Sequence, residues 1–146
     1  MAEAPVNGAA PARRVAITGI GCITPIGTGP EALWAGLERR ASAVRRIDRF
    51  DASPFRSRIA AQVPDFDATD YLEPKAVKRL DRFAQFSVCA ARLALDDAGL
   101  DPAELEPERV AVQLGSALGG VSYAEEQLGN FLRGGVRAVN PLLALA

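Results

Sequence analysis

Two stretches of the chain decide its fold, RVAITGIGCITPIG over residues 14–27 and VAVQLGSALGG over residues 110–120. In each, a short apolar run leads into glycines, which is typical of a strand that ends in a tight loop. Residues 15–17 are apolar on both faces, and this pattern favours a sheet covered by helices. The two stretches therefore predict an α/β protein in which residues 110–114 form a second, central or half-buried strand.

A first helix is predicted directly after the opening loop. Thr28 and Glu31 stand at capping-box spacing, so the helix is expected to run from there through Leu37. Its apolar side chains, Trp34 among them, are expected in the core.

Residues 74–99 predict the longest helix, because apolar side chains recur at helical spacing and Gly99 offers a C-terminal stop. Another helix is expected over residues 121–132, before a pair of glycines. At about 100° per residue, four basic side chains of the long helix fall roughly opposite its apolar stripe. They predict a basic ridge that faces water: Lys75, Lys78, Arg79 and Arg82.

Composition excludes several classes of partner. The chain has 17 Lys+Arg against 18 Asp+Glu, a net charge of −1, so no overall field favours nucleic acid or an anionic membrane. Its apolar runs are interrupted well before the ~18 residues of a membrane span. Residues 39–58 carry seven arginines interleaved with acids, which predicts a solvated, salt-bridged loop rather than a nucleic-acid site.

The two cysteines, Cys22 and Cys89, are predicted to be packing residues. A nucleophilic thiol needs a nearby base or a helix N-terminus, whereas Cys89 falls late on the long helix and the chain contains no histidine. Two cysteines without a recognisable leader sequence favour a cytoplasmic protein over a disulfide scaffold. No metal site is expected.

A dinucleotide-binding loop is the first alternative for residues 15–21, since glycines there would let the backbone approach a pyrophosphate. The match is weak. The helix begins only near Gly29, and Pro25 removes a donor amide from the loop. A nucleotide-binding oxidoreductase fragment therefore stays as the less favoured hypothesis.

Several further motifs follow the opening stretch in a fixed order: LDRF at 80–83, DAGL at 97–100, GSALGG at 115–120 and NP at 140–141. In this order, over nearly everything from Arg13 to Ala146, they resemble the amino-terminal third of β-ketoacyl-[acyl-carrier-protein] synthases. The resemblance implies a thiolase-like, layered αβαβα fold, of which this chain would supply most of the first half only. Residues 1–12, rich in Ala and Pro, are expected to be a disordered tail before a ketosynthase domain at 13–146 that is apparently truncated.

The resemblance also implies the site residues. Leu118 matches a position at the bottom of the acyl pocket, and the glycines around it allow close backbone approach. Ala117 stands where many family members have glycine, and Leu143, like Leu142, stands where aromatic side chains are frequent. The substrate-binding residues are therefore expected to be Ala117, Leu118 and Leu143. The residues matching positions that dock an acidic acyl carrier protein are Lys75, Lys78, Arg79 and Arg137.

The implied activity is decarboxylative Claisen condensation of malonyl-carrier protein with an acyl thioester, in fatty-acid or type II polyketide biosynthesis. The family places the nucleophilic cysteine and two histidines downstream of Ala146, so this segment has no catalytic residue and is expected to be inactive alone. No cofactor of its own is expected, because phosphopantetheine is carried by the acyl carrier protein. The alternative within the same fold is a non-catalytic partner subunit of the chain-length-factor type, and either would form a homodimer or a heterodimer.

Overall fold

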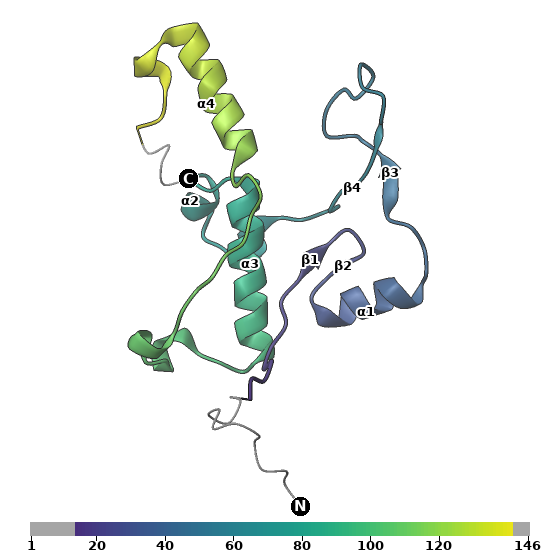
Figure 1. The fold of residues 1–146 in the computed structure, drawn as a ribbon, viewed down its shortest axis with the longest axis vertical. Helices are drawn as coiled ribbons and strands as arrows, with labels where there is room; N and C mark the ends of the chain where they lie inside the picture. The colour runs from purple at the N-terminus through teal and green to yellow at the C-terminus, as the bar shows by residue number, and fades with distance from the viewer. Residues whose placement is uncertain (1–13, 142–146) are drawn as a thin grey trace, which may run out of the picture.

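The computed structural model describes residues 14–141. Within that range, two small antiparallel hairpins and four α-helices are joined by short 3₁₀ turns (Figure 1). The strands are β1 (Ile23–Thr24), β2 (Gly27–Thr28), β3 (Val44–Arg46) and β4 (Ile59–Ala61). The α-helices are α1 (Pro30–Glu38), α2 (Pro74–Val77), α3 (Arg82–Asp97) and α4 (Val121–Gly134). The 3₁₀ turns are η1 (Ala68–Asp70), η2 (Pro102–Glu104), η3 (Pro107–Arg109) and η4 (Val136–Ala138).

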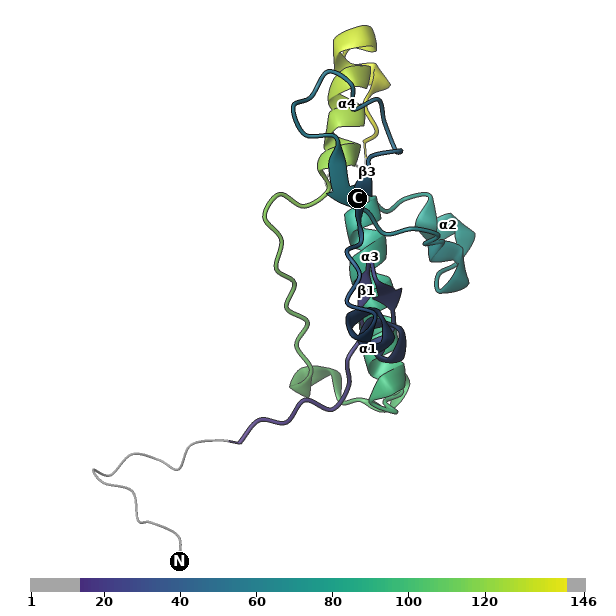
Figure 2. The ribbon, with the colours of Figure 1, turned by 90° about the vertical axis from the view of Figure 1, so that its right-hand side faces the viewer.

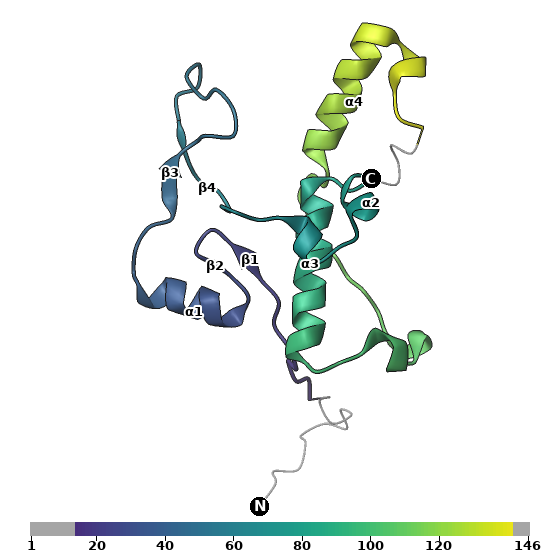
Figure 3. The same ribbon diagram turned by 180° about the vertical axis from the view of Figure 1, so that it is seen from behind.

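Helix α3 stands at the centre of this arrangement (Figure 1). After α3 the chain passes through η2 and η3 and returns to the upper end of α3, where α4 begins. The β1–β2 hairpin and α1 lie on one side of α3, next to the arm formed by β3, β4 and their connection, whereas α2 lies on the other (Figure 3). After a quarter turn α1, β1, β3, α3 and α4 fall into a vertical band, and α2 projects to one side of it (Figure 2). The described chain is thus a thin, open plate with α3 as its axis.

The first helix forms where the sequence predicts it, but its start and its burial differ from the prediction. Gly29 is the N-cap at φ 83°, and no side chain caps the helix, so the predicted capping box of Thr28 and Glu31 is absent. Trp34 is 63% exposed and donates from Nε1 to Glu38 Oε1 on the same helix at 3.0 Å. The expected core position of Trp34 is therefore wrong for the described chain.

The predicted long helix is broken in two. Gln85 donates from Nε2 to the carbonyls of Val77 and Leu80, at 3.1 and 2.9 Å, and so satisfies acceptors at the end of α2. Asp81 then caps α3 by accepting the Phe83 N–H at 2.8 Å. Because the break separates α2 from α3, the predicted basic ridge is wrong in one member: Arg82 packs against Phe66 and Phe86 instead. Gly99, at φ 64°, follows the end of α3 as predicted.

The two predicted strands are not strands within the described chain. Residues 15–17 and 110–114 have no assigned regular structure, and Val15 and Val112 are each 91% exposed. A strand in a covered sheet needs hydrogen bonds from neighbouring strands. The hairpins that do form at residues 23–28 and 44–61 are local, and neither pairs with these two segments.

The arginine-rich stretch also differs from the prediction. Arg45 and Arg46 of this stretch lie in β3, which pairs with β4 just after the stretch, with Arg45 opposite Ala60. Its arginines are solvated as expected, but none is salt-bridged, because the ion pair found among residues 14–141 joins Arg109 to Glu106.

The core is small and lies against the middle of α3. Its fully buried member is Cys89, which packs with Ala68 of η1 and with Leu72, two residues after the end of η1. The opening segment reaches the next turns of α3 through glycines. A Cβ on Gly21 would lie 1.9 Å from the Ala90 carbonyl oxygen, so only glycine fits. The Ile20 N–H donates to Asp97 Oδ2 at 2.8 Å and holds the same segment on the helix.

Candidate functional site

The glycine-rich loop at residues 115–120 connects an extended segment to the start of α4. Gly119 has φ 64°, a left-handed conformation that favours glycine, and its N–H donates to Ser116 Oγ at 2.9 Å. The Val121 N–H donates to the Gly119 carbonyl at 3.0 Å and leads directly into α4. The loop is therefore a tight turn with its own internal hydrogen bonds, as its glycines predict.

Asp81 attaches this loop to α3. Its carboxylate is 7% exposed: Oδ1 accepts the Phe83 N–H and Oδ2 accepts the Tyr123 N–H, each at 2.8 Å. One side chain thus caps both α3 and the first turn of α4, where the positive ends of the helix dipoles stabilise its negative charge. Gly120 packs directly on it, since a Cβ there would lie 3.1 Å from Asp81 Cβ. The end of the loop that leads into α4 is therefore held against α3 by a buried carboxylate.

The predicted substrate-binding residues lie at the turn of this loop. Leu118 is 81% exposed and Ala117 is exposed too, and neither lines the cavity beside the loop that Gly115, Ser116 and Gly119 line. Leu143 lies outside the described residues, as does the expected tail at residues 1–12. The loop presents Leu118 outward from a fixed base.

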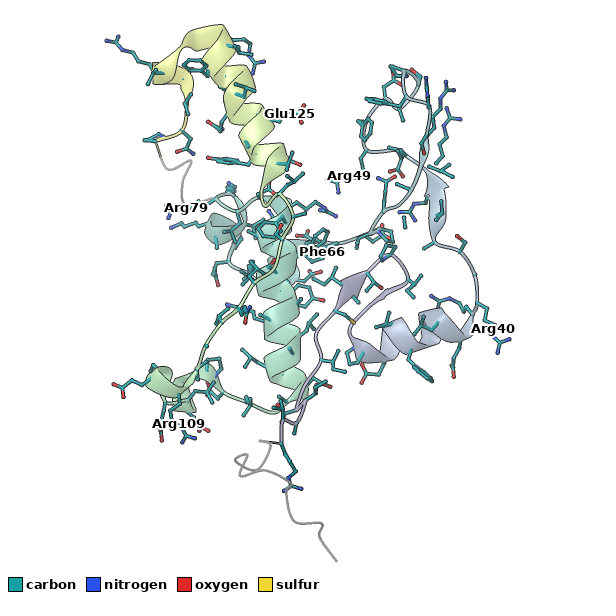
Figure 4. All side chains as sticks on the ribbon, in the orientation of Figure 1. Arg40, Arg49, Phe66, Arg79, Arg109 and Glu125 are labelled. Carbon is teal, nitrogen blue, oxygen red and sulfur yellow. The ribbon has the colours of Figure 1, made fainter. Side chains whose placement is uncertain are left out.

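Three of the four predicted docking residues lie together. Lys75 is in α2, Lys78 is its C-cap and Arg79 follows, and all three are exposed. Arg79 extends from the side of α2 that faces away from α3 (Figure 4). Arg137 is exposed in η4, the 3₁₀ turn that follows the C-terminal end of α4, whereas the loop at the N-terminal end of α4 packs on Asp81. The structure therefore forms a basic cluster on α2 and sets Arg137 apart from it.

Neither cysteine is placed for nucleophilic chemistry by the residues described. Cys89 is 0% exposed, and burial raises the pKa of its thiol, which disfavours the reactive thiolate. Cys22 is half-buried in the segment before β1. Among residues 14–141 no three potential metal ligands gather at one place, and no helix is long and apolar enough to cross a membrane.

The glycines of the opening segment do not form a dinucleotide loop. A Cβ on Gly19 would lie 2.2 Å from the Ala94 carbonyl oxygen, so this glycine, like Gly21, provides close approach to α3. The helix that follows, α1, begins only after the β1–β2 hairpin. This geometry, with the comparison that follows, leaves the oxidoreductase hypothesis without support.

Comparison with known proteins decides the family. The family described as "Beta-ketoacyl synthase, N-terminal domain" matches residues 12–142. The chain belongs to the β-ketoacyl synthase family. It is 40% identical to a 3-oxoacyl-[acyl-carrier-protein] synthase 2 of Synechocystis sp., over 90% of this chain and 32% of that protein.

Solved ketosynthases have the same fold. The ishigamide ketosynthase/chain length factor superposes with a TM-score of 0.76 at 36% identity, over 88% of this chain and 32% of the other. A type II polyketide synthase acyl-carrier protein in complex with its ketosynthase bound to the hexaketide gives a TM-score of 0.71 at 25% identity, covering 89% and 33%. The chain therefore has part of the thiolase-like ketosynthase fold, as predicted, and it spans about a third of the length of these relatives.

The roles of two residues in this segment are not predicted by the sequence reasoning above. Asp81 was read as one position in a continuous helix, although an Asp before a new apolar turn is an N-cap signal. The close approach of Gly21 to α3 had no local signal, because it joins segments about seventy residues apart in the sequence.

Proposed function

We propose that this segment forms the amino-terminal part of a β-ketoacyl-[acyl-carrier-protein] synthase that condenses malonyl-carrier protein with an acyl thioester, in fatty-acid or type II polyketide biosynthesis. The main support for this proposal is the match of residues 12–142 to the amino-terminal domain of the β-ketoacyl synthase family. In this reaction a cysteine thiolate takes the acyl group, and two histidines assist the loss of CO2 from the malonyl unit. The resulting carbanion attacks the acyl thioester, whose oxyanion is stabilised by backbone amides.

The residues described here would not perform the chemistry themselves. Cys89 is buried and the chain has no histidine, so the reactive groups would come from polypeptide beyond Ala146. The segment alone would be inactive, which a malonyl-carrier decarboxylation assay on residues 1–146 tests directly. Phosphopantetheine would arrive on the carrier protein, and the enzyme would act in the cytoplasm as a dimer.

The role of the glycine-rich loop would be to limit acyl length. Leu118 is the one large apolar side chain on a loop fixed by Asp81, so it can close a pocket against the end of an alkyl chain without moving. Ala117 beside it and Leu143 would shape the same wall.

The basic cluster on α2 would dock the acidic carrier protein. Lys75, Lys78 and Arg79 present positive charge on an exposed turn, and Arg137 would add a separate contact. Such charges act mainly by steering the encounter and by setting the orientation of the partner.

A non-catalytic partner subunit remains the second candidate, and a specific observation favours it: one of the similar solved structures is a ketosynthase/chain length factor pair. The two candidates differ in one product. A condensing enzyme of natural full length, incubated with acyl-carrier protein, forms an acyl thioester on its own cysteine, which intact-mass spectrometry detects; a partner subunit forms none.

The acyl-length role is tested in the natural full chain by Leu118→Phe. The larger ring should shorten the longest acyl chain accepted, whereas Leu118→Ala should lengthen it. Leu132→Phe, an equally large change at an exposed position of α4, is the matched control. Unchanged product lengths in both Leu118 variants would show that Leu118 does not limit acyl length.

A further inference from the structure

Two arginines without a counter-ion line a pocket between the β3–β4 arm and the junction of α3 with α4. Arg49 comes from the arm, and Figure 4 places it in the space between the arm and the base of α4. Arg82 is the first residue of α3. Both line a cavity of about 540 Å³, whose opposite wall includes Gly115 and Gly119 of the glycine-rich loop. The pocket lies against the loop without including Leu118.

Arg82 is the more constrained of the two. Its guanidinium carbon lies 4.8 Å from the centre of the Phe86 ring and 5.3 Å from that of Phe66, so two aromatic faces hold it. Its Nε atom is buried and has no hydrogen-bond partner. Burial lowers the pKa of Arg82, and the nearby charge of Arg49 lowers it further. A buried, unpaired donor of this kind usually marks the place of an acceptor such as a water or an ion.

The protein does not provide that acceptor within residues 14–141. Neither Arg49 nor Arg82 has a carboxylate within ion-pair distance in this range. Asp81 is the acid in the pocket wall, but both of its oxygens already accept amide protons, from Phe83 and Tyr123. Asp48 and Asp65 line a neighbouring cavity with the same two arginines, but neither aspartate forms an ion pair with them. Two like charges are thus held near one pocket without an ion-pair partner among residues 14–141.

Neutral donors line the same pocket. Gln62 accepts the Asp48 N–H through Oε1 at 3.3 Å, which leaves its amide NH₂ to donate. Ser116 accepts the Gly119 N–H through Oγ, which leaves its O–H to donate. Ser122 also lines the cavity. The lining is therefore rich in donors, and its one carboxylate is already hydrogen-bonded.

We propose that this pocket binds a phosphate group between Arg49 and Arg82. A tetrahedral phosphate offers more acceptor oxygens than a carboxylate, so it can take both guanidinium groups and still accept from Gln62 and the serine hydroxyls. Its charge would offset the repulsion between the arginines and supply the missing acceptor for Arg82. Because Gly115 and Gly119 form part of the wall, a bound phosphate would also brace the glycine-rich loop.

Calorimetric titration of the natural full-length protein with inorganic phosphate tests the proposal without an activity assay. Saturable binding is expected, and Arg49→Gln or Arg82→Gln should each weaken it by at least about tenfold, because each removes charge-assisted hydrogen bonds. Arg46→Gln is the matched control, since Arg46 is an exposed arginine of the same arm that lines neither pocket containing Arg49. Arg49 is exposed, so its variant tests the site even where Arg82→Gln does not fold.

A second titration with glycerol phosphate separates the two sources of the group. Binding of the monoester at least as tight as that of phosphate indicates a phosphorylated ligand, and binding of phosphate alone indicates the free ion; both support the site. Absence of saturable binding by either, or an equal loss in Arg46→Gln, overturns it. These outcomes are independent of the acyl-enzyme measurement that tests the proposed activity.

Discussion

Asp81 is the residue on which the greatest number of local features depends. It ends the gap between α2 and α3, caps α3, accepts the Tyr123 N–H of α4 and packs closely on Gly120. A helical pattern read along the sequence shows neither of the last two contacts, because they join segments about forty residues apart. The local N-cap signal was readable, and the contact across the fold was not.

Asp81→Asn is expected to lower the free energy of unfolding by about 1–3 kcal/mol. The remaining Oδ1 can still cap α3, but the amide NH₂ would face the Tyr123 N–H, so two buried donors would oppose each other. Urea unfolding of the full-length protein measures the change. Asp101→Asn is the control, because Asp101 caps the exposed turn η2 through one oxygen and an asparagine can do the same. Equal effects of the two variants would contradict the role of Asp81.

Gly21 makes a second residue-scale prediction. Gly21→Ala would put a methyl group 1.9 Å from the Ala90 carbonyl oxygen, so the opening segment must move away from α3. We expect a loss of stability of about 1–3 kcal/mol, the usual range for overpacking. Gly115→Ala is the matched control for stability, because nothing lies within 4 Å of its Cβ position and its φ is not left-handed. In thermal unfolding of the full-length protein, the melting temperature should fall for Gly21→Ala and stay unchanged for Gly115→Ala.

At the scale of elements, the ends of helices at glycines were predictable, whereas the break between α2 and α3 and the strands were not. The stop of α3 at Gly99 and of α4 near Gly135 follows from local sequence, since both glycines take positive φ. The segments at 15–17 and 110–114 have the apolar pattern of strands, but a strand depends on partners elsewhere in the fold. The family and fold followed from the order of the motifs, whereas the positions of the site residues depended on packing that no local pattern records.

The basic cluster on α2 yields an element-scale prediction. The double variant Lys78→Glu with Arg79→Glu should weaken binding of acyl carrier protein roughly threefold to tenfold and flatten its dependence on salt, since it reverses steering charges. Surface plasmon resonance at several ionic strengths measures both. Arg56→Glu, an exposed charge reversal on the β3–β4 arm, is the control. An equal loss in the control would indicate a general charge effect rather than docking at α2.

The whole molecule exposes more surface than a compact domain of its mass. Its accessible surface is 12229 Å² for 15.4 kDa, against about 7,200 Å² expected from the scaling of folded monomers. Large apolar side chains such as Ile17, Val112 and Leu132 are among those exposed. A core centred on Cys89 is too small to offset the conformational entropy of the chain by itself.

The isolated 146-residue segment should therefore bind the dye ANS strongly and unfold without a cooperative transition. Near-UV circular dichroism and urea titration measure the packing and the cooperativity, and the natural full-length protein is the control. A sigmoidal transition, with the steep denaturant dependence of a compact domain of this size, would show that the segment folds alone.

The hydrogen bond from Ile20 to Asp97 joins residues 77 positions apart, and this separation matters while the protein is being made. At about 5–20 residues per second, a ribosome needs roughly 4 to 15 s to add the residues between donor and acceptor. Throughout that interval the opening segment lacks the helix on which Gly19 and Gly21 dock. Newborn chains of this protein would thus be early clients for holding chaperones, before α3 has been made.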